Sequence, residues 1–461
     1  MTEDLINKKD IYFPSYLGTN NNSITLLNRA TQILCDWFSN AEKSGPLTFD
    51  ENFKCLMPDE YGDSTEDLFS EIQSLLNNSF NPVHPGSLAH LDPPPLIFSI
   101  LGDLIAAGLN NNLLAYELSP SVTLLEESIC KWFAKKIGFN DSSGGIAASG
   151  GTLSNLNALI AARYNAGLGS DPDSVLLVSE DAHSSFIKCT RIMGLADTNL
   201  VKIKTDNKGC MDIDNLKKSL DQCLRNNKKI FAIVATLGTT VRGAIDPIKN
   251  ISDICKERNI WLHIDGSIGG IFGVTSIPIE GLNNIHQANS ITINPQKIIG
   301  ITKTSSLLLV SNMRTLENTF STGLPYISSK ENIVNRGELG IQGSRPAEVI
   351  KLWLGLRSLG LKGMEDILTS SINRKDFFIK NINKNKFEIY SGPLHIISFL
   401  PKGLTTKDTD FWTQSKVNEL MKNNFMLSRP KFKGKYYLKV VMGNYNTNES
   451  HIEELLKILH A

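Results

Sequence analysis

The sequence predicts an α/β protein with a mostly parallel sheet flanked by helices. From about residue 95, short apolar segments of strand length alternate with amphipathic segments of helix length. Parallel sheets with crossover helices produce this alternation. Polar or charged residues follow the ends of several of these strands, and open α/β sheets bind ligands at that edge. The 461 residues suffice for a large core and two or three subdomains.

The predicted elements begin with an N-terminal arm that contains helices at 23–41 and 64–76, because apolar residues recur there at helical spacing. In the sheet region, helices are predicted at 96–109, 120–137, 152–165, 183–193, 212–225 and 248–258, and strands at 174–179, 200–203, 231–235, 261–264, 291–294 and 306–310. A loop-rich stretch at 313–346 follows, then a helix at 347–359 that ends at Gly360, strands near 395–400 and 436–442, and a closing helix from residue 449. This pattern predicts an arm (1–90), a large α/β domain (91–350) and a small α+β domain (351–461).

Composition narrows the function classes. Lys+Arg and Asp+Glu number 47 each, so no charge excess favours nucleic acid or an anionic membrane. Seven scattered cysteines without C-x-x-C spacing are typical of a reduced protein with neither a disulfide framework nor structural zinc. The N-terminus lacks the features of a signal peptide, and the apolar run at 94–109 is too short to span a bilayer. We expect a soluble, cytoplasmic protein with no metal, nucleic-acid or membrane partner.

One lysine stands where a parallel sheet would place a ligand. Ile291 and Ile293 alternate with polar residues, Pro295 ends the strand pattern, and Lys297 follows. A lysine in such a place can form a Schiff base with a carbonyl cofactor when its amine is desolvated. Taken alone, a solvated surface charge is the commoner explanation.

A small-residue turn stands before the helix predicted at 152–165. It contains Ser149, Gly150, Gly151 and Thr152. Backbone N–H groups at such a helix start can bind an anion, and the helix dipole favours negative charge there. The alternative is an ordinary glycine loop in which Ser149 or Thr152 caps the helix.

Two further strand ends carry side chains of chemical interest. His183 follows the strand at 174–179, and its imidazole could stack on a flat ring or relay protons, although most loop histidines are solvated. Asp265 ends the strand at 261–264, where a buried carboxylate needs a cationic partner or else serves as a helix cap. A hydroxyl-rich turn ending at Thr240 follows the strand at 231–235. An anion cradle, a stacking group, a carboxylate and an amine together match the needs of pyridoxal 5′-phosphate.

These motifs resemble those of the group II pyridoxal-phosphate-dependent amino acid decarboxylases. The resemblance rests on Ser-Gly-Gly-Thr at 149–152, Asp-x-His-x-Ser at 181–185, Thr-Leu-Gly-Thr-Thr at 236–240, His-Ile-Asp-Gly at 263–266 and Asn-Pro-Gln-Lys at 294–297. It runs from about His84 to the C-terminus. It implies the fold of the aspartate aminotransferase-like (fold type I) enzymes and a homodimer with the active site between two subunits.

The resemblance also implies roles for individual residues. Lys297 matches the Schiff-base lysine, Asp265 the partner of the pyridine nitrogen, His183 the stacked histidine and Tyr326 the mobile-loop tyrosine that helps to return a proton. The remaining cofactor contacts it implies are Ser149, Gly150, Gly151, Thr152, Thr240, Ser267, Ser290, Asn294 and Gln296. Gln296 replaces the usual histidine and cannot be protonated, and 343–346 keep one arginine of a usual pair.

The implied reaction is decarboxylation of an L-amino acid to its amine and carbon dioxide. The stretch 84–93 lacks the aromatic residues of the aromatic decarboxylases, and His90 or Asp92 could face a polar or cationic side chain. L-2,4-diaminobutyrate is therefore the first expectation, with glutamate, aspartate or cysteine sulfinate next. Two alternatives remain: another reaction on the same cofactor, and a catalytically silent homologue that acts as a scaffold.

Overall fold

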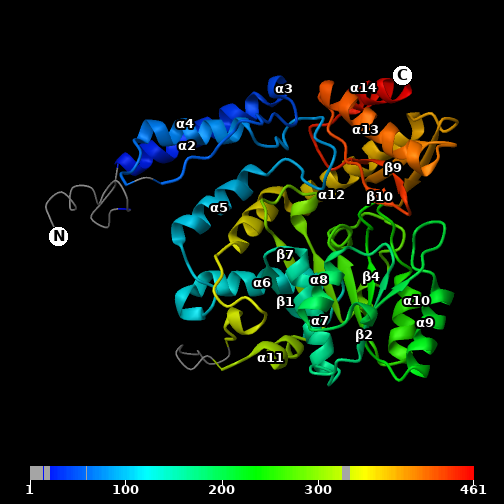
Figure 1. Cartoon of the computed structure of the whole chain (residues 1–461). Coiled ribbons are helices and arrows are strands. Elements are labelled where there is room, and N and C mark those ends of the chain that lie inside the picture. Colours follow the sequence, from blue (N-terminus) through cyan, green and yellow to red (C-terminus); the bar gives the residue numbers. More distant parts are fainter. Residues whose placement is uncertain (1–13, 15–20, 59, 324–332) are drawn as a thin grey trace.

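The computed structural model describes residues 14, 21–58, 60–323 and 333–461. A seven-stranded sheet with the order β1-β7-β6-β5-β4-β2-β3 forms its centre (Figure 1). The strands are β1 (Gly144–Ala148), β2 (Ser174–Ser179), β3 (Leu200–Ile203), β4 (Lys229–Thr236), β5 (Trp261–Gly266), β6 (Ser290–Ile293) and β7 (Ser306–Val310). β2 to β6 pair in parallel, and β7 is antiparallel to both of its neighbours. The predicted α/β class is confirmed.

The first strand, β1, is missing from the prediction because it begins with two glycines, which are depleted in strands. The close approach of β7 explains why glycine is needed at Gly145. A Cβ on Gly145 would lie 2.1 Å from the Leu308 carbonyl oxygen. Because β1 runs in the same direction as β6, it brings residues 149–152 to the edge where β2, β4, β5 and β6 end.

Helices cover both faces of the sheet. One face packs against α6 (Pro120–Lys136), α9 (Ile213–Arg225) and α10 (Ile248–Glu257), and the other against α7 (Gly151–Asn165), α8 (Ser185–Ile192) and α11 (Arg314–Phe320). Side chains alternate between the faces along each strand. On β5, Leu262 and Ile264 belong to the first core, so His263 and Asp265 point toward α7.

The N-terminal helices α2 (Asn21–Ser39) and α4 (Thr65–Asn77) lie side by side and project beyond the body of the molecule (Figure 1). The short α3 (Ala41–Ser44) lies between them in the chain and contacts α2. Below them, α5 (Ile97–Leu109) packs on α12 (Val349–Asn381). The two helix backbones come close because Gly102 has no side chain: a Cβ there would lie 2.3 Å from the Lys351 Cα.

The C-terminal part departs most from prediction. The helix predicted to end at Gly360 does break there, with φ at 61°, but it resumes and reaches Asn381. A three-stranded antiparallel sheet follows, formed by β8 (Phe387–Ser391), β9 (Ile396–Pro401) and β12 (Leu438–Val441), with α13 (Thr406–Lys422), the hairpin β10 (Lys431–Phe432)–β11 (Lys435–Tyr436) and α14 (Glu449–His460). The stretch predicted as loop at 313–346 contains α11. The division at residues 90 and 350 stays a proposal.

Among the described residues, no helix combines the length and apolar character that crossing a membrane requires. No group of three or more histidine, cysteine, aspartate or glutamate side chains in the same residues is arranged to hold a metal ion.

Candidate active site

A cavity of about 190 Å³ opens at the edge where the parallel strands end. Residues from five successive parts of the chain line it: Gly151, Thr152 and Asn155 from α7, His183 after β2, Thr236, Gly238, Thr239 and Thr240 at the end of β4 and beyond, Asp265, Ser267 and Ile268 at the end of β5 and beyond, and Asn294, Gln296 and Lys297 after β6. The cavity therefore joins an amine, a carboxylate, an imidazole and the start of a helix.

Lys297 ends a short 3-10 turn (Pro295–Lys297) directly after β6. Its side chain is half-buried. Burial lowers the pKa of the Lys297 amine below its ordinary value, against the opposing charges of Asp265 and Asp92. A lowered pKa increases the share of free amine, which is the nucleophilic form.

Asp265 is a buried carboxylate at the end of β5, 5% exposed. Its oxygens accept hydrogen bonds from the Asn155 amide at 3.2 Å and from the Ser267 backbone N–H at 3.1 Å. Burial acts to raise the pKa of Asp265, but the Lys297 amine and the Ser267 hydrogen bonds hold it below its ordinary value. Asp265 is therefore an anion at neutral pH.

The start of α7 forms the anion-binding end of the cavity. Gly150 has φ at 96°, which favours glycine. A Cβ on Gly151 would lie 2.7 Å from both the Asn294 amide nitrogen and the Ser267 hydroxyl, so only glycine leaves the backbone N–H groups accessible. The Ser306 hydroxyl donates to Asn294 Oδ1 at 2.6 Å, which leaves the Asn294 amide nitrogen as the donor for a ligand.

Two predicted phosphate contacts lie elsewhere. Ser149 does not line the cavity; it is exposed and exchanges hydrogen bonds with Gln342. Ser290 is fully buried at the opposite end of β6, where Trp261 Nε1 donates to its hydroxyl at 2.8 Å and His263 Nδ1 lies at 2.8 Å. The geometry therefore does not support Ser290 as a phosphate contact, because a strand's length separates it from the ligand edge.

His183 and Gln296 have defined hydrogen-bond partners. The Ser185 backbone N–H donates to His183 Nδ1 at 3.2 Å, so Nε2 carries the proton in the neutral ring. Burial lowers the pKa of His183. The Gln296 carbonyl oxygen accepts from the Ser305 backbone N–H, which leaves its amide NH₂ as a donor.

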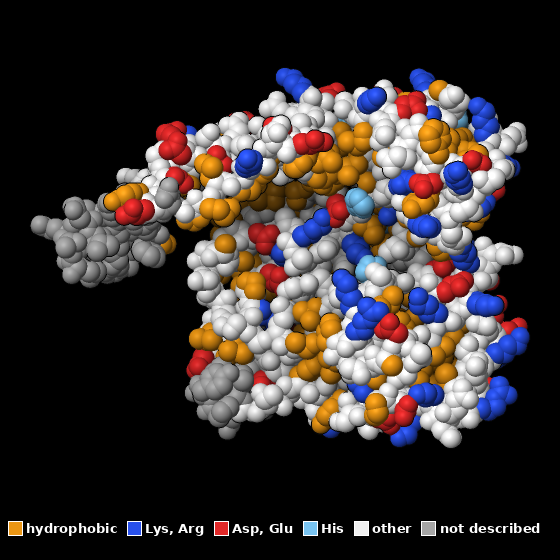
Figure 2. All heavy atoms as spheres, in the orientation of Figure 1, with side chains coloured by type: hydrophobic (Ala, Val, Ile, Leu, Met, Phe, Trp, Pro, Cys, Tyr) orange, Lys and Arg blue, Asp and Glu red, His pale blue; other side chains and the backbone are white. Residues whose placement is uncertain are grey.

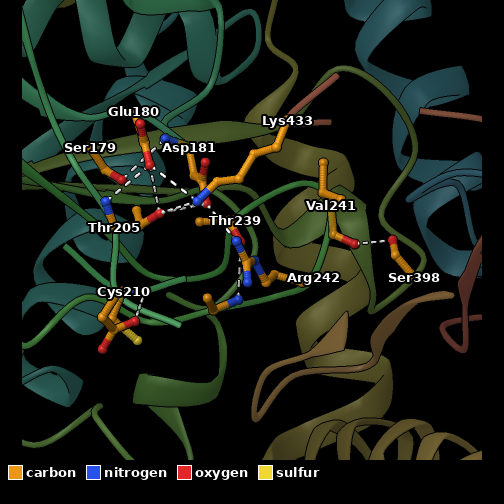
Figure 3. A network of polar contacts seen from close by, with 12 residues as sticks. Ser179, Glu180, Asp181, Thr205, Cys210, Thr239, Val241, Arg242, Ser398 and Lys433 are labelled. Carbon is orange, nitrogen blue, oxygen red and sulfur yellow. Dashed lines mark hydrogen bonds and ion pairs between the residues drawn. The ribbon is translucent and has the colours of Figure 1, made fainter. Parts of the chain in front are cut away.

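A polar network fixes the loops that carry His183 and Thr240 (Figure 3). The buried Arg242 donates to Asp181 at 3.1 Å and lies 4.9 Å from the centre of the Phe432 ring. Lys433, in the same hairpin as Phe432, lies 3.2 Å from Glu180. These contacts join the β10–β11 hairpin to the loops after β2 and β4.

The predicted substrate residues lie beside a group of lysines. His90 is exposed, and the Asp92 carboxylate forms an ion pair with Lys303. Lys439 on β12 interacts electrostatically with Asp92, His90 and Lys297. Burial lowers the pKa of Lys439 to about 8. Figure 2 shows the hollow between the N-terminal helices and the body, with charged and histidine side chains beside it.

The sequence alone did not indicate three residues in or near the candidate site, and one predicted site residue cannot be placed in the structure. Lys439 comes from β12, far from every motif, and no local signal marks it. Asn155 stands just after a recognised motif, and His263 begins one but was given no role. The i, i+2 spacing of His263 and Asp265 on one strand could have indicated that they share a face. Tyr326 lies outside the described residues.

A lysine amine and a buried carboxylate on one parallel sheet, facing each other across a cavity at a helix start, define the class of fold type I pyridoxal-phosphate enzymes. Comparison with known proteins gives the family. Residues 50–399 match the family model described as the pyridoxal-dependent decarboxylase conserved domain. The chain belongs to this family and is a pyridoxal-phosphate-dependent amino acid decarboxylase.

Curated relatives differ in substrate class. The chain is 29% identical over 405 residues to an aromatic-L-amino-acid decarboxylase of Bacillus atrophaeus, covering 84% of both proteins. It is 27% identical over 409 residues to an acidic amino acid decarboxylase of Mus musculus, covering 83% of this chain and 74% of the relative.

Solved structures agree in fold. TDC from Oryza sativa, solved with PLP and tryptamine, superposes with a TM-score of 0.90 at 19% identity, covering 97% of this chain and 98% of that one. The glutamate decarboxylase domain of a diaminobutyrate-pyruvate transaminase and L-2,4-diaminobutyrate decarboxylase from Vibrio parahaemolyticus gives a TM-score of 0.86 at 22% identity, with 98% of both chains covered.

Proposed function

We propose that this enzyme decarboxylates an acidic L-amino acid, and that Lys297, Asp265 and His183 act directly on the cofactor. One observation carries the substrate class: near Lys297, the amines of Lys303 and Lys439 lie beside the single carboxylate of Asp92. This excess of basic groups favours a substrate whose side chain is an anion. The chemistry is that of glutamate, aspartate or cysteine sulfinate.

The residues of the cavity fit pyridoxal phosphate. Asp265 accepts hydrogen bonds from two neutral donors, while an ionised carboxylate has about four acceptor sites. A protonated ring nitrogen would supply the cationic partner that a buried carboxylate needs. The glycine turn before α7 provides the N–H groups that a phosphate needs.

Each residue then has a defined task. Bound pyridoxal phosphate supplies the electron sink for the bond that breaks. Lys297 would bind the cofactor aldehyde, Asp265 would hold a proton on the ring nitrogen, and His183 would lie against the ring. Thr152 and Asn294 would bind the phosphate at the turn that Gly150 and Gly151 shape, and Ser267, Thr240 and Gln296 would complete the walls. Tyr326 stays our candidate for returning a proton to the substrate.

The prediction of L-2,4-diaminobutyrate as substrate rested on the lack of aromatic residues at 84–93 and on His90 or Asp92 as a partner for a polar or cationic side chain. The Asp92 carboxylate is already paired with Lys303, so a cationic substrate side chain would have to displace that lysine and approach Lys439 as well. The geometry does not favour this substrate. A catalytically silent scaffold is also disfavoured, because the amine, carboxylate and imidazole that chemistry needs share one cavity.

We further propose that the enzyme is a cytoplasmic homodimer. The outer face of α5 carries six large apolar side chains that are 42–61% exposed: Ile97, Phe98, Leu101, Leu104, Ile105 and Leu109. An exposed patch of this kind marks a protein interface, and a second copy of the chain is the occupant we expect. Sedimentation should give a dimer, and Leu101→Glu with Ile105→Glu should give monomers.

A panel of L-amino acids incubated with the purified holoenzyme tests the substrate class. We expect release of carbon dioxide and the amine of an acidic amino acid. Equal or faster turnover of diaminobutyrate or of an aromatic amino acid would overturn the proposal, and identification of the product by mass spectrometry would separate decarboxylation from transamination or oxidative deamination.

A further inference from the structure

A line of buried polar groups runs through the core behind Asp265. Trp261, His263 and Asp265 occupy alternate positions of β5 and share the face that α7 covers. Ser290 pairs with His263 across β5 and β6, and Asn155 reaches the same face from α7. Asn155, His263 and Ser290 are at most 1% exposed. On the opposite face of the same strands, the corresponding positions are apolar.

The hydrogen bonds of this line form an unbroken chain. Trp261 Nε1 lies 2.8 Å from the Ser290 hydroxyl, which lies 2.8 Å from His263 Nδ1. His263 Nε2 lies 3.1 Å from Asn155 Oδ1, and the Asn155 amide nitrogen lies 3.2 Å from Asp265 Oδ2. Asp265 itself lines the cavity.

The residues at the two ends of this hydrogen-bond chain, Trp261 and Asp265, fix the direction of every hydrogen bond in it. An indole N–H can only donate, and a carboxylate can only accept. The Asn155 amide must therefore turn its NH₂ toward Asp265 and its oxygen toward His263. His263 Nε2 then carries the proton, and Ser290 donates to Nδ1. Burial lowers the pKa of His263 to about 4, so the ring is neutral and this single tautomer is retained.

Burying a chain of hydrogen-bonded polar side chains in the core costs desolvation free energy, which suggests that this one serves the active site. Each buried polar member must be satisfied, and apolar residues of similar shape would do as well for folding. The chain does not conduct protons, because the amide of Asn155 does not exchange a proton between its oxygen and nitrogen. What it does supply is a fixed N–H directed at one oxygen of a carboxylate, and hydrogen bonding to the charged form favours that form.

We propose that Asn155 and His263 are positioning residues that hold Asp265 ionised and oriented toward the ring nitrogen of the cofactor. This inference rests on the proposed role of Asp265. Asn155 acts on the carboxylate, and His263 acts by holding the Asn155 amide. Ser290 and Trp261 orient the imidazole in turn, which assigns Ser290 a role in place of phosphate binding.

The test compares two cofactors: pyridoxal phosphate and its 1-deaza analogue, in which carbon replaces the ring nitrogen. Equilibrium dialysis with the apoenzyme gives the affinity for each cofactor. The ratio of the two affinities reports the strength of the contact between Asp265 and the ring nitrogen. Asn155→Leu and His263→Leu should each lower this ratio on the order of tenfold, the size expected from a hydrogen bond to a charged group. His263→Gln keeps an N–H for Asn155 and should retain most of the ratio.

A matched control lies two residues away on α7. Asn157 is also fully buried and accepts one hydrogen bond, from the Ile341 N–H at 3.1 Å, but it does not line the cavity. Asn157→Leu should lower stability as Asn155→Leu does and leave the ratio unchanged.

Three outcomes decide the matter. If Asp265→Asn lowers the affinity ratio and the Asn155 and His263 variants do not, the positioning role of Asn155 and His263 is refuted, while the role of Asp265 stands. If Asp265→Asn itself leaves the ratio unchanged, the role of Asp265 fails. Equal losses in His263→Gln and His263→Leu would contradict the assigned hydrogen-bond direction.

Discussion

The two ends of the proposed active site are built in different ways. At the proposed cofactor end, Asp265 lies at the end of β5 and Lys297 follows the neighbouring parallel strand β6, and neutral hydrogen bonds hold the carboxylate in a buried position. At the substrate end, charged groups meet from three distant segments: Asp92 before α5, Lys303 before β7 and Lys439 on β12. Several of these side chains remain partly exposed.

This difference indicates which properties each end controls. Because neighbouring strands position the carboxylate and the amine, their positions relative to each other are fixed, and a reaction on a bound cofactor requires such fixed positions. At the proposed substrate end, solvent partly screens the Lys303–Asp92 pair, and these charges can be replaced one at a time. We therefore expect changes at the cofactor end to abolish the reaction and changes at the substrate end to alter affinity and substrate preference.

The largest effect should follow Lys297→Ala. Removing the proposed nucleophile should lower kcat by on the order of 10⁶-fold, as when the covalent nucleophile of a serine protease is removed. Borohydride should attach the cofactor covalently to the wild-type protein and not to this variant, as peptide masses would show. Attachment at another lysine would contradict the assignment.

Lys439→Met should come next. Losing this cation should raise KM for the best acidic substrate about tenfold, because a charge-assisted contact of typical strength is lost, while kcat changes less. Lys416, whose amine contacts Glu419 at 2.8 Å on α13, offers a control: Lys416→Met should leave KM unchanged. A fall in kcat with constant KM would place Lys439 in the chemical step instead.

The same lysine should set a pH dependence. Burial lowers the pKa of Lys439 to about 8, so the cation is present below that pH and is lost above it. The kcat/KM for an acidic substrate should fall as pH rises through about 8. Lys439→Arg should remove this fall, because a guanidinium stays protonated. A fall that persists in Lys439→Arg would point to another group.

Asp92→Asn should have the smallest effect. The ion pair with Lys303 is partly exposed, so its loss should change the free energy of unfolding by less than about 1 kcal/mol. Freeing Lys303 should lower KM for an acidic substrate by roughly twofold to fivefold. A loss of acidic substrate binding, or a change of preference toward aromatic substrates, would show that Asp92 has a different task.

The same contrast explains what could be predicted from sequence. Strand alternation and the residues after each strand end located Asp265, His183 and Lys297, because parallel strands deliver their ends to one edge. The glycine turn was placed for the same reason. The strand before it was missed, since Gly144 and Gly145 have low strand propensity and are needed where β7 approaches closely.

The substrate end could not be predicted in this way. Lys439 reaches the site through the pairing of β12 with β9, a contact between segments with no shared motif. The interpretation of Asp92 treated it as a free anion, because its partner Lys303 stands 211 positions later in the chain. Ser290 was assigned to the phosphate from a family resemblance, although its place at the start of β6 puts it at the wrong end of the strand.

The proposed role of Asp265 is to keep a proton on the ring nitrogen of the bound cofactor. NMR of the holoenzyme with ¹⁵N in that ring measures this directly. We expect the resonance of a protonated nitrogen from about pH 6 to about pH 9, and that of a neutral nitrogen in Asp265→Asn. A neutral nitrogen in the wild-type enzyme at neutral pH would contradict it.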